Sequence, residues 1–510
     1  MDSNILKIGY NTSWNDHLNK SFAFDAPANH GKGVDFVLCH MPMGGTVEEE
    51  CNHARDAVEY FDARGIDFIA NFEAQNFEAD IKSSDGYDWA NRPDGTHRLN
   101  LPEEYIRSFT GGKSFLGIMY DEFEHALINR NISITLASKF RKVLPLFPPS
   151  ENTDIVEQGE LCAKQFKEYA DYIKSSGAPS FAGEHVFPVL YHTFARAGIT
   201  PNFKSQKESS SNIQFAIAVG AALEYGTELW NCVDLWFNMT FPGHSVNEMY
   251  HNLIFAYLAG VNRVYVEHAN AMVSRDEQGN PYYNDYGKQF SRFTEEYRGK
   301  QRSYTFNDYK PEIGIIRYDD TYWGQGDPVA WRYMLFGNKR IKPDYRAKEW
   351  IKAFNLITHG ELGNKALTWH RVCLRSLRKH RSFATMNGAA VFDDRVTKDK
   401  LTSLKLCFLC GYHISPETLK SVDELVKENG LTAVTSKRFL PKELVNKVKG
   451  DVCEIPHGKG RYIVTKNFAK KKLRKSLAPL LGKKDEITMR FADKLIRLKI
   501  SKDGESFTQI

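Results

Sequence analysis

The chain has 510 residues, of which 42% are apolar and 13% aromatic, and its formal net charge is +5. These values exclude disordered, collagen-like and small disulfide-rich proteins, and the length predicts two or three domains or a large barrel. No run of 18 or more apolar residues occurs, so we expect no membrane span.

Strand-like apolar runs alternate with helix-length amphipathic segments over the first three hundred residues, which is typical of βα units around a parallel sheet. Helical patterns such as TVEEECNHARDAVEYFDARG and SVNEMYHNLIFAYLAG end at a glycine, as a helix C-cap does. The predicted strands cover residues 6–14, 35–43, 67–75, 115–125, 188–194, 227–237, 262–269 and 312–320. Eight such units predict an α/β protein with a (β/α)8 TIM barrel, which we assign to residues 1–310.

The last predicted strand, EIGIIRYDD at 312–320, has two possible places. It either closes the barrel or opens the next domain, and in the second case the barrel takes a strand from elsewhere, for instance APSFAGEHV. The apolar periodicity is compatible with both places, so both remain open.

From about residue 340 the pattern changes to short buried strands such as GAAVFDD, KLCFLCGYH and GRYIVTKNF, with the helix-like SPETLKSVDELVKENG among them. This pattern predicts a smaller flavodoxin-like α/β domain over residues 311–468. The domain has neither a G-x-G-x-x-G motif nor a P-loop, so the sequence does not support nucleotide binding.

Residues 469–510 are expected to form a basic C-terminal tail with short strands. The run 466–484 carries eight Lys or Arg and no acid, so the rest of the chain sums to a charge of −3. Such a run is most often a solvated surface, with contact to an anionic polymer or a membrane surface as the alternative. We expect no nucleic-acid partner.

The chain begins MDSNILKIGY, without an apolar signal region, and its eight cysteines are scattered among strand-like runs rather than spaced as a disulfide framework. Both features predict a reducing, cytoplasmic location. Cys407 and Cys410 form a CxxC, but residues three apart on a strand face opposite sides, so we expect no redox or metal role there.

Acids, histidines and aromatic residues recur at the carboxyl ends of the predicted barrel strands. In a barrel of this type these ends meet on one face, where the βα loops build the site. The residues concerned are Asn71, Glu73, Gln75, Tyr120, Asp121, Glu122, Glu124, Glu184, His185, Tyr191, His192, Trp230, Asn231, Asp234, Trp236, Glu267 and His268.

Burying several carboxylates together is costly, because like charges and desolvation raise their pKa values. Glycoside hydrolysis needs such an arrangement: one carboxyl group protonates the leaving oxygen, while another attacks the anomeric carbon or activates water. The eight tryptophans and 24 tyrosines offer flat faces on which sugars stack. The pattern therefore predicts a glycoside hydrolase acting on an oligo- or polysaccharide.

The pairing of an acid at the end of strand four with a glutamate at the end of strand seven resembles the clan A retaining glycoside hydrolases. A barrel followed by a flavodoxin-like domain, with GAAVFDDRVT, LKLCFLCGYHISPETLKSVDELVKENG and HGKGRYIVT, is similar to the family 42 β-galactosidase-type enzymes and their trimerisation domain. This resemblance covers most of the chain in architecture. It implies a retaining mechanism without a cofactor.

The resemblance makes Glu122 the acid/base and Glu267 the nucleophile. The clan places Asn before its acid/base, whereas this chain has Asp121, which implies a different contact to the sugar 2-hydroxyl. If EIGIIRYDD belongs to the second domain, the nucleophile moves to TELWNCVDLW, where Glu228 and Asp234 are the candidates.

The remaining candidates are assigned to substrate binding: Glu73, Tyr120, Asp121, Glu184, His185, His192, Trp230, Asp234, Trp236 and His268. Their histidines do not follow a metal-ligand spacing such as H-E-x-x-H, so no metal is expected. Two alternatives stay open: a metal-assisted hydrolase or lyase on the same barrel, and a non-catalytic carbohydrate-binding protein. A homo-oligomer formed through the second domain is also possible.

Overall fold

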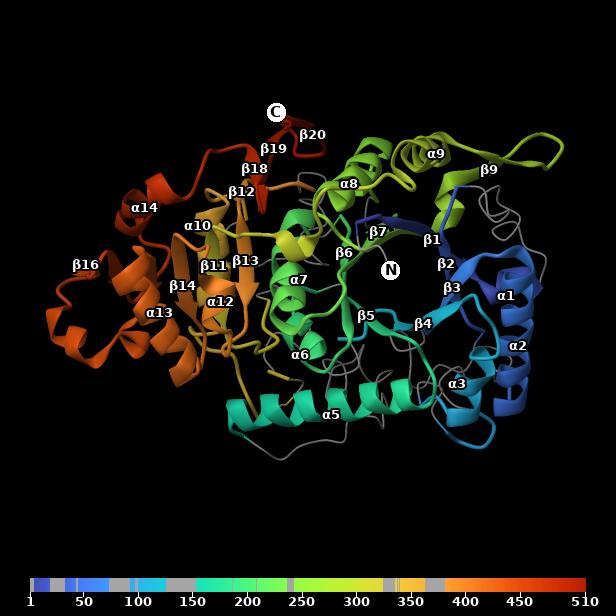
Figure 1. The fold of residues 1–510 in the computed structure, drawn as a ribbon, viewed down its shortest axis with the longest axis horizontal. Helices are drawn as coiled ribbons and strands as arrows, with labels where there is room; N and C mark the ends of the chain where they lie inside the picture. The colour runs from blue at the N-terminus through green and yellow to red at the C-terminus, as the bar shows by residue number, and fades with distance from the viewer. Residues whose placement is uncertain are drawn as a thin grey trace.

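Eight parallel strands close into a barrel in the computed structural model, and β8 pairs with β1 to complete it (Figure 1). The strands are β1 (Lys7–Ser13), β2 (Phe36–His40), β3 (Asp67–Phe72), β4 (Phe115–Tyr120), β5 (Phe181–His185), β6 (Thr200–Ser205), β7 (Trp230–Asp234) and β8 (Arg263–Glu267). The structure describes residues 4–18, 33–42, 45–72, 92–96, 100–124, 153–185, 187–207, 209–235, 243–323, 335–336, 338, 340–362 and 381–510. The prediction of a TIM barrel is confirmed.

Helices surround the barrel, and their ends follow from local sequence. The helix α2 begins with a capping box between Thr46 and Glu49 and ends at Gly65, whose positive φ of 62° suits glycine. The helices of this part are α1 (Trp14–Leu18), α2 (Val47–Arg64), α3 (Glu103–Phe109), α5 (Ile155–Ser175), α6 (Tyr191–Arg196), α7 (Ser211–Tyr225), α8 (Val246–Leu258) and α9 (Asp285–Tyr297). A hairpin of β9 (Val273–Arg275) and β10 (Pro281–Tyr283) precedes α9.

One of the predicted barrel strands is wrong, and the place of EIGIIRYDD, which the sequence left open, is now defined. Residues 188–194 are not a strand, because Tyr191–Arg196 form the helix α6, whose apolar residues also fit a helical spacing. APSFAGEHV supplies the fifth strand instead, and the sixth strand, β6, was not predicted. EIGIIRYDD lies outside the barrel, so NRVYVEHA becomes the eighth strand.

EIGIIRYDD contributes β11 to a separate six-stranded sheet with the order β13-β11-β14-β15-β17-β16. Five parallel strands in this order reproduce the 2-1-3-4-5 arrangement of flavodoxin-like sheets, with β16 as an antiparallel edge. The strands are β11 (Ile313–Arg317), β13 (Ala389–Phe392), β14 (Leu406–Cys410), β15 (Thr432–Thr435), β16 (Val452–His457) and β17 (Gly460–Thr465). The accompanying helices are α10 (Glu349–Ile357), α12 (Lys398–Leu401) and α13 (Pro416–Asn429).

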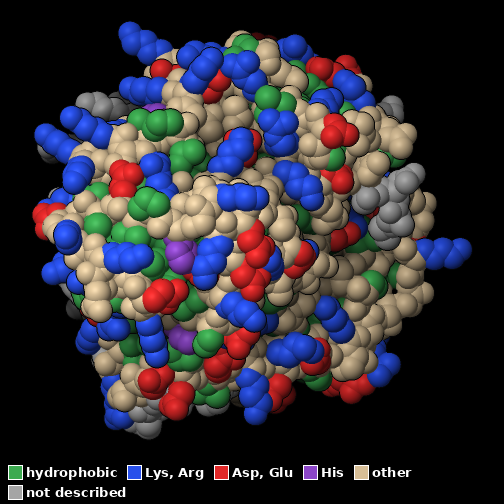
Figure 2. Space-filling model, turned by 60° about the vertical axis from the view of Figure 1, so that its left-hand side comes forward, with side chains coloured by type: hydrophobic (Ala, Val, Ile, Leu, Met, Phe, Trp, Pro, Cys, Tyr) green, Lys and Arg blue, Asp and Glu red, His purple; other side chains and the backbone are tan. Residues whose placement is uncertain are grey.

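The short strands predicted in the C-terminal residues pair with one another and with β12 in a further sheet. It comprises β12 (Met386–Asn387), β18 (Glu486–Phe491), β19 (Lys494–Ile500) and β20 (Phe507–Gln509), and the helix α14 (Lys471–Leu477) precedes β18. Figure 2 brings the side of the second sheet forward and shows many Lys and Arg side chains on this face. The 3-10 helices are η5 (Ala269–Met272), η6 (Phe306–Asp308), η8 (Lys437–Phe439), η9 (Lys442–Lys447) and η10 (Ala478–Leu480).

The helix α7 lies between the barrel and the second sheet (Figure 1). Almost all of its side chains are buried, because it faces β6 on one side and β13 on the other. At Gly220 the helix approaches β13 so closely that a Cβ atom would overlap the backbone carbonyl of Val391. Within the described residues, no helix combines the length and the apolar character needed to cross a membrane.

Candidate active site

The interior of the barrel changes from apolar to polar along the strands. Its lower part is a cluster of Phe36, Leu38, Ile69, Met119, Ala182, Trp230, Cys232 and Tyr265. Side chains on a strand alternate between its two faces, so the residue two positions further along each strand also points inward. At the carboxyl ends these inward positions hold His40, Asn71, Asp121, Glu184, Asp234 and Glu267. The alternation therefore gathers polar groups in one layer at the mouth of the barrel.

Lys204, on β6, is the centre of this layer. Its Nζ lies 2.9 Å from Oε2 of Glu267 and 3.0 Å from Oε2 of Glu184. Three further acids surround the same ammonium group at 3.4 to 3.7 Å: Asp121, Glu122 and Asp234. One cation is thus shared by five carboxyl groups from β4, β5, β7 and β8.

The charges of this cluster fix the protonation of its members. Burial opposes the charged form of Lys204, but Glu184, Glu267, Asp121 and Asp234 outweigh it and raise the lysine pKa well above its usual value. Burial also opposes the ionised form of Asp121, yet Lys204, a hydrogen bond with Glu184 and the nearby His40 lower its pKa. An ion pair of charged Lys204 and ionised Asp121 therefore lies at the centre.

Glu122 is the acid of the cluster that a substrate can reach. Its side chain is 22% exposed, whereas the other four are at most 5% exposed. Its backbone has a φ of 50°, a left-handed conformation that turns the residue just after β4 toward Lys204. Burial and the charges of Asp121, Glu124 and Glu267 raise the pKa of Glu122 well above its usual range. These effects favour the protonated form of Glu122 over a wider pH range than for an ordinary glutamate.

Asp234 and Glu267 form a neighbouring pair, because they face each other in the register of β7 and β8. Burial and the charge of Asp234 raise the pKa of Glu267 to about 7. His268 Nδ1 lies 3.2 Å from Asp234 Oδ1, and this hydrogen bond and the two acids overcome burial to raise the histidine pKa to about 9. Asp234 thus has two cationic neighbours, Lys204 and His268.

Glu184 is held from below by the barrel interior. Tyr265 donates a hydrogen bond to its Oε1, and Asn202 Nδ2 donates to the Tyr265 hydroxyl at 2.7 Å. Burial and the charge of Asp121 raise the pKa of Glu184 well above its usual range. With an exposed fraction of 1%, Glu184 supports the cluster rather than facing the mouth.

Four predicted residues lie away from this layer: Tyr120, His185, His192 and Trp230. The Tyr120 side chain points out of the barrel and shares a hydrogen bond with Tyr169 of α5. His185 also points outward, where its ring stacks on Tyr191 and its Nδ1 donates to the Val189 carbonyl at 3.0 Å. Burial lowers the pKa of His185 to about 3, so this ring is neutral.

His192 lies on α6, at the contact with the second sheet, where Nε2 donates to the Val391 carbonyl at 2.9 Å. Trp230 belongs to the apolar lower interior and donates from Nε1 to Glu228 Oε2 at 2.7 Å. Glu228 therefore lies at the amino end of β7, away from the mouth. Of the two alternative nucleophile candidates, only Asp234 lies at the carboxyl end of β7. Glu73 and Trp236 lie outside the described residues.

Two groups of potential metal ligands lie in the cluster. Ligand atoms of Glu184, Cys232 and Glu267 lie within 4.8 Å of one another, and so do those of Asp234, Glu267 and His268. The ammonium of Lys204 contacts Glu184, Asp234 and Glu267, so a cation already balances these carboxylates. The chemistry of the donor set therefore fits a metal ion poorly.

Lys204 and the strand that carries it are the parts of the site that sequence reasoning missed. The segment TPNFKS is short and lacks an apolar run, because its inward residues, Thr200, Asn202 and Lys204, are all polar. The sequence pointed to Lys204 only as a lysine between two short βα units, which is weak evidence for a site residue.

Neither a family model nor a curated protein matches the sequence. Among solved structures, the exo-β-1,4-mannosidase Op5Man5 from Opitutaceae bacterium strain TAV5 is 12% identical, covers 94% of this chain and 95% of its own, and has a TM-score of 0.49. The catalytic module of a family 98 glycoside hydrolase from Streptococcus pneumoniae TIGR4 is 10% identical, with coverages of 98% and 73% and a TM-score of 0.47. The β-mannanase from the blue mussel Mytilus edulis is 10% identical, with coverages of 59% and 94% and a TM-score of 0.35. At these identities and TM-scores the three structures do not assign an activity to this chain.

Proposed function

We propose that the protein is a glycoside hydrolase that uses Glu122 as its general acid and Asp234 as its ionised carboxylate, with Glu267 beside it. The observation that carries this proposal is the group of five carboxyl groups around Lys204, in which the most accessible one has a raised pKa. A proton donor next to an ionised acid is the arrangement that glycosidic bond cleavage requires.

In the proposed reaction, Glu122 gives its proton to the glycosidic oxygen while the bond from that oxygen to the anomeric carbon breaks. Asp234 either attacks the anomeric carbon or takes a proton from the water that does so. Lys204 and His268 each place a cationic group within 3.6 Å of Asp234, and opposite charges this close favour an ionised carboxylate. If Asp234 attacks, a water molecule later breaks the bond between Asp234 and the sugar and gives a proton to the ionised Glu122; if Asp234 acts as a base, it keeps that proton of water. In both cases the hydroxyl of water ends on the anomeric carbon, and the alcohol leaves with the proton that Glu122 gave.

Asp234 replaces Glu267 as the first candidate for the second role because NRVYVEHA is the eighth strand and β7 ends at Asp234. Glu267, with a pKa of about 7, is only partly ionised near neutral pH. We assign Glu267 to tuning the charge of Asp234. The family 42 likeness, a retaining outcome, a cytoplasmic location and an oligomer formed through the second domain remain predictions.

The test is a screen of aryl glycosides and oligosaccharides with the wild-type protein and two variants. Glu122→Gln and Asp234→Asn should each lower kcat by about 10²–10⁴-fold, because each removes proton transfer or the attacking charge. Glu160→Gln, on the exposed face of α5, is the matched control and should keep full activity. Unchanged turnover in either site variant would refute its assigned role.

The anomer of the first product, followed by NMR, decides the stereochemistry. Glu122 and Asp234 approach the same Nζ at 3.4 and 3.6 Å, so their separation is compatible with both about 5–5.5 Å for retention and about 6.5 Å for inversion. The resemblance to clan A predicts retention. An inverted first product would contradict that prediction but not the roles of the two acids.

A metal-assisted reaction is the second candidate, because two triads of possible ligands lie in the cluster. It predicts that chelation abolishes turnover and that one divalent ion restores it. The glycosidase proposal predicts that turnover is unchanged by chelators.

A further inference from the structure

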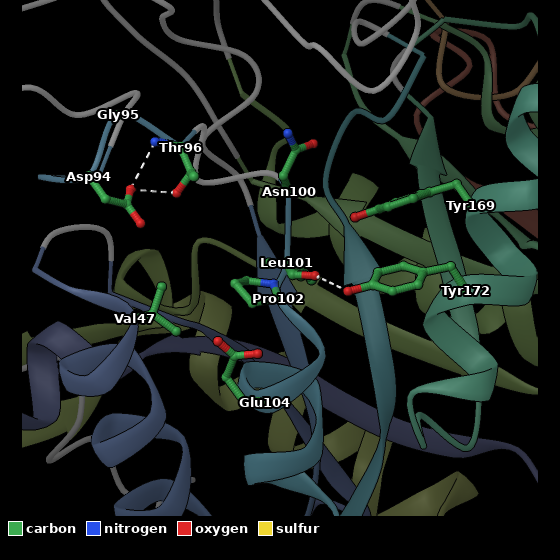
Figure 3. A pocket seen from close by; sticks show the side chains of 10 residues that line it. All are labelled: Val47, Asp94, Gly95, Thr96, Asn100, Leu101, Pro102, Glu104, Tyr169 and Tyr172. Atoms are coloured by element: carbon green, nitrogen blue, oxygen red, sulfur yellow. Dashed lines mark hydrogen bonds between the residues drawn. The ribbon is translucent and has the colours of Figure 1, made fainter.

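A second cavity lies outside the ring of barrel strands, between α2, α3 and α5 (Figure 3). Its volume is about 670 Å³, which is the size of a typical small-ligand pocket. Tyr169 and Tyr172 extend into it from α5, and Glu104 reaches it from α3. None of the carboxyl groups around Lys204 lines this cavity.

The two tyrosines give the cavity an aromatic wall. Their rings are roughly parallel, at 27° and with centroids 6.1 Å apart. Tyr172 is one of the few large apolar side chains of the described residues that stay exposed, at 37%, and its hydroxyl is fixed by donation to the Leu101 carbonyl at 2.8 Å. An exposed ring held in one orientation is a platform on which a pyranose face can stack.

The opposite wall offers hydrogen-bond acceptors. Asn100 has a side-chain oxygen that is buried and lacks a hydrogen-bond partner, an arrangement that costs free energy unless a ligand donates to it. The carboxylates of Asp94 and Glu104 also point toward the cavity, and the lining residues that the structure describes include neither Lys nor Arg. Such a lining suits a ligand rich in hydroxyl donors and disfavours a carboxylated or sulfated one.

The cavity is connected to the catalytic layer through stacked rings. Tyr169 stacks on Tyr120 at an angle of 5°, and their hydroxyl groups share a hydrogen bond. Tyr120 is the last residue of β4 and directly precedes Asp121.

We propose that this cavity is a carbohydrate-binding site that stacks a neutral sugar ring on Tyr172 and receives its hydroxyl groups at Asn100 and Glu104. The inference rests on the proposed function only for the choice of carbohydrate as the ligand. It makes long neutral oligosaccharides better ligands than single sugars.

Calorimetric titration of the full-length Glu122→Gln protein tests this site without turnover, with neutral β-1,4-linked gluco- and manno-oligosaccharides of two to six residues as probes. Adding Tyr172→Ala should weaken hexasaccharide binding about tenfold, because the stacking face is lost. Tyr172→Phe keeps that face and should bind like the parent. Asn100→Ala, with the thermal midpoint as a check on folding, should also weaken binding.

Equal hexasaccharide affinity in Tyr172→Ala and its parent would overturn the proposal. It would also be overturned if neither the gluco- nor the manno-oligosaccharides bound to the parent. Hydrolysis of aryl glycosides of single sugars distinguishes failure of the cavity proposal from failure of the proposed function. If Tyr172→Ala changes neither binding nor aryl glycoside turnover, the cavity proposal fails and the proposed function stands. If oligosaccharides bind through Tyr172 but the wild-type protein cleaves none of them, the proposed function fails and the site stands.

Discussion

Lys204 is the residue on which the charge balance of the barrel mouth depends. Its ammonium lies within 3.7 Å of five carboxyl groups, and its side chain is only 2% exposed. Without it, Asp121 and Asp234 would be buried anions with weaker compensation. An uncompensated buried charge is among the most destabilising changes in a protein.

Lys204→Met should therefore lower the free energy of unfolding at pH 7 by about 3–5 kcal/mol. The loss should be smaller at pH 4.5, because the freed carboxyl groups then take up protons. Urea unfolding at the two pH values measures the difference, and Lys164→Met, on an exposed face of α5, is the control. Equal destabilisation at both pH values would contradict the electrostatic explanation.

Glu267 links stability to pH. Its pKa is about 7 in the folded protein against an ordinary value of 4.5, so the folded state holds a proton that the unfolded chain releases between these values. The contribution of Glu267 to the free energy of unfolding is fully present below pH 4.5. It falls by about 3 kcal/mol as the pH rises toward 7. Glu267→Gln should remove that part of the slope.

Unfolding free energies of the wild type and Glu267→Gln between pH 4.5 and 7.5 measure this contribution. Parallel curves would show that Glu267 ionises normally in the folded protein. Glu160→Gln changes an exposed carboxyl group and should leave the slope unchanged.

Among the elements, α7 makes the closest approach between the barrel and the second sheet. Gly220→Ala places a methyl group where the Val391 carbonyl of β13 lies, and backbone atoms cannot move aside cheaply. We expect a loss of about 1–3 kcal/mol from overpacking. Gly111→Ala is the control, because no atom lies within 4 Å of its added Cβ. A Gly220→Ala protein as stable as the wild type would mean that α7 and β13 can separate.

Strands whose inward side chains are apolar could be predicted from the sequence. Strands that contribute to the polar layer were predicted only in part. FLGIMY and RVYVE alternate or run apolar and were recognised as strands. TPNFKS was not recognised as a strand, because its inward residues are polar and the acids that pair with Lys204 lie on strands distant in the sequence. PVLYHTF was misassigned, since a short apolar run fits a helix and a strand equally well.

The same distinction holds for the site. Glu122, Asp234 and Glu267 could be proposed from the sequence, because acids directly after apolar strands converge at one end of a barrel. Which acid is protonated depends on Lys204, and no local pattern connects that lysine to five carboxyl groups on four other strands. Tyr120 and His185 were assigned to the site by proximity in sequence, but the alternation of β4 and β5 turns them outward.

On the scale of the whole molecule, the barrel and the second sheet pack together through α6 and α7. The barrel holds the five-carboxylate cluster, while the second sheet contacts α6 and α7 behind β5 and β6, the strands that carry Glu184 and Lys204. The proposed function depends on Glu122 acting as the proton donor in the intact protein.

The most direct measurement is the kcat/KM of Glu122→Gln on a series of aryl glycosides with leaving groups of increasing pKa. The account predicts a small loss for a dinitrophenyl leaving group, which departs without protonation, and a loss of about 10²–10⁴-fold for an alkyl or sugar leaving group. Asp234→Asn should lose activity on both kinds of substrate. An equal loss across the series in Glu122→Gln would contradict the assignment of Glu122 as the acid.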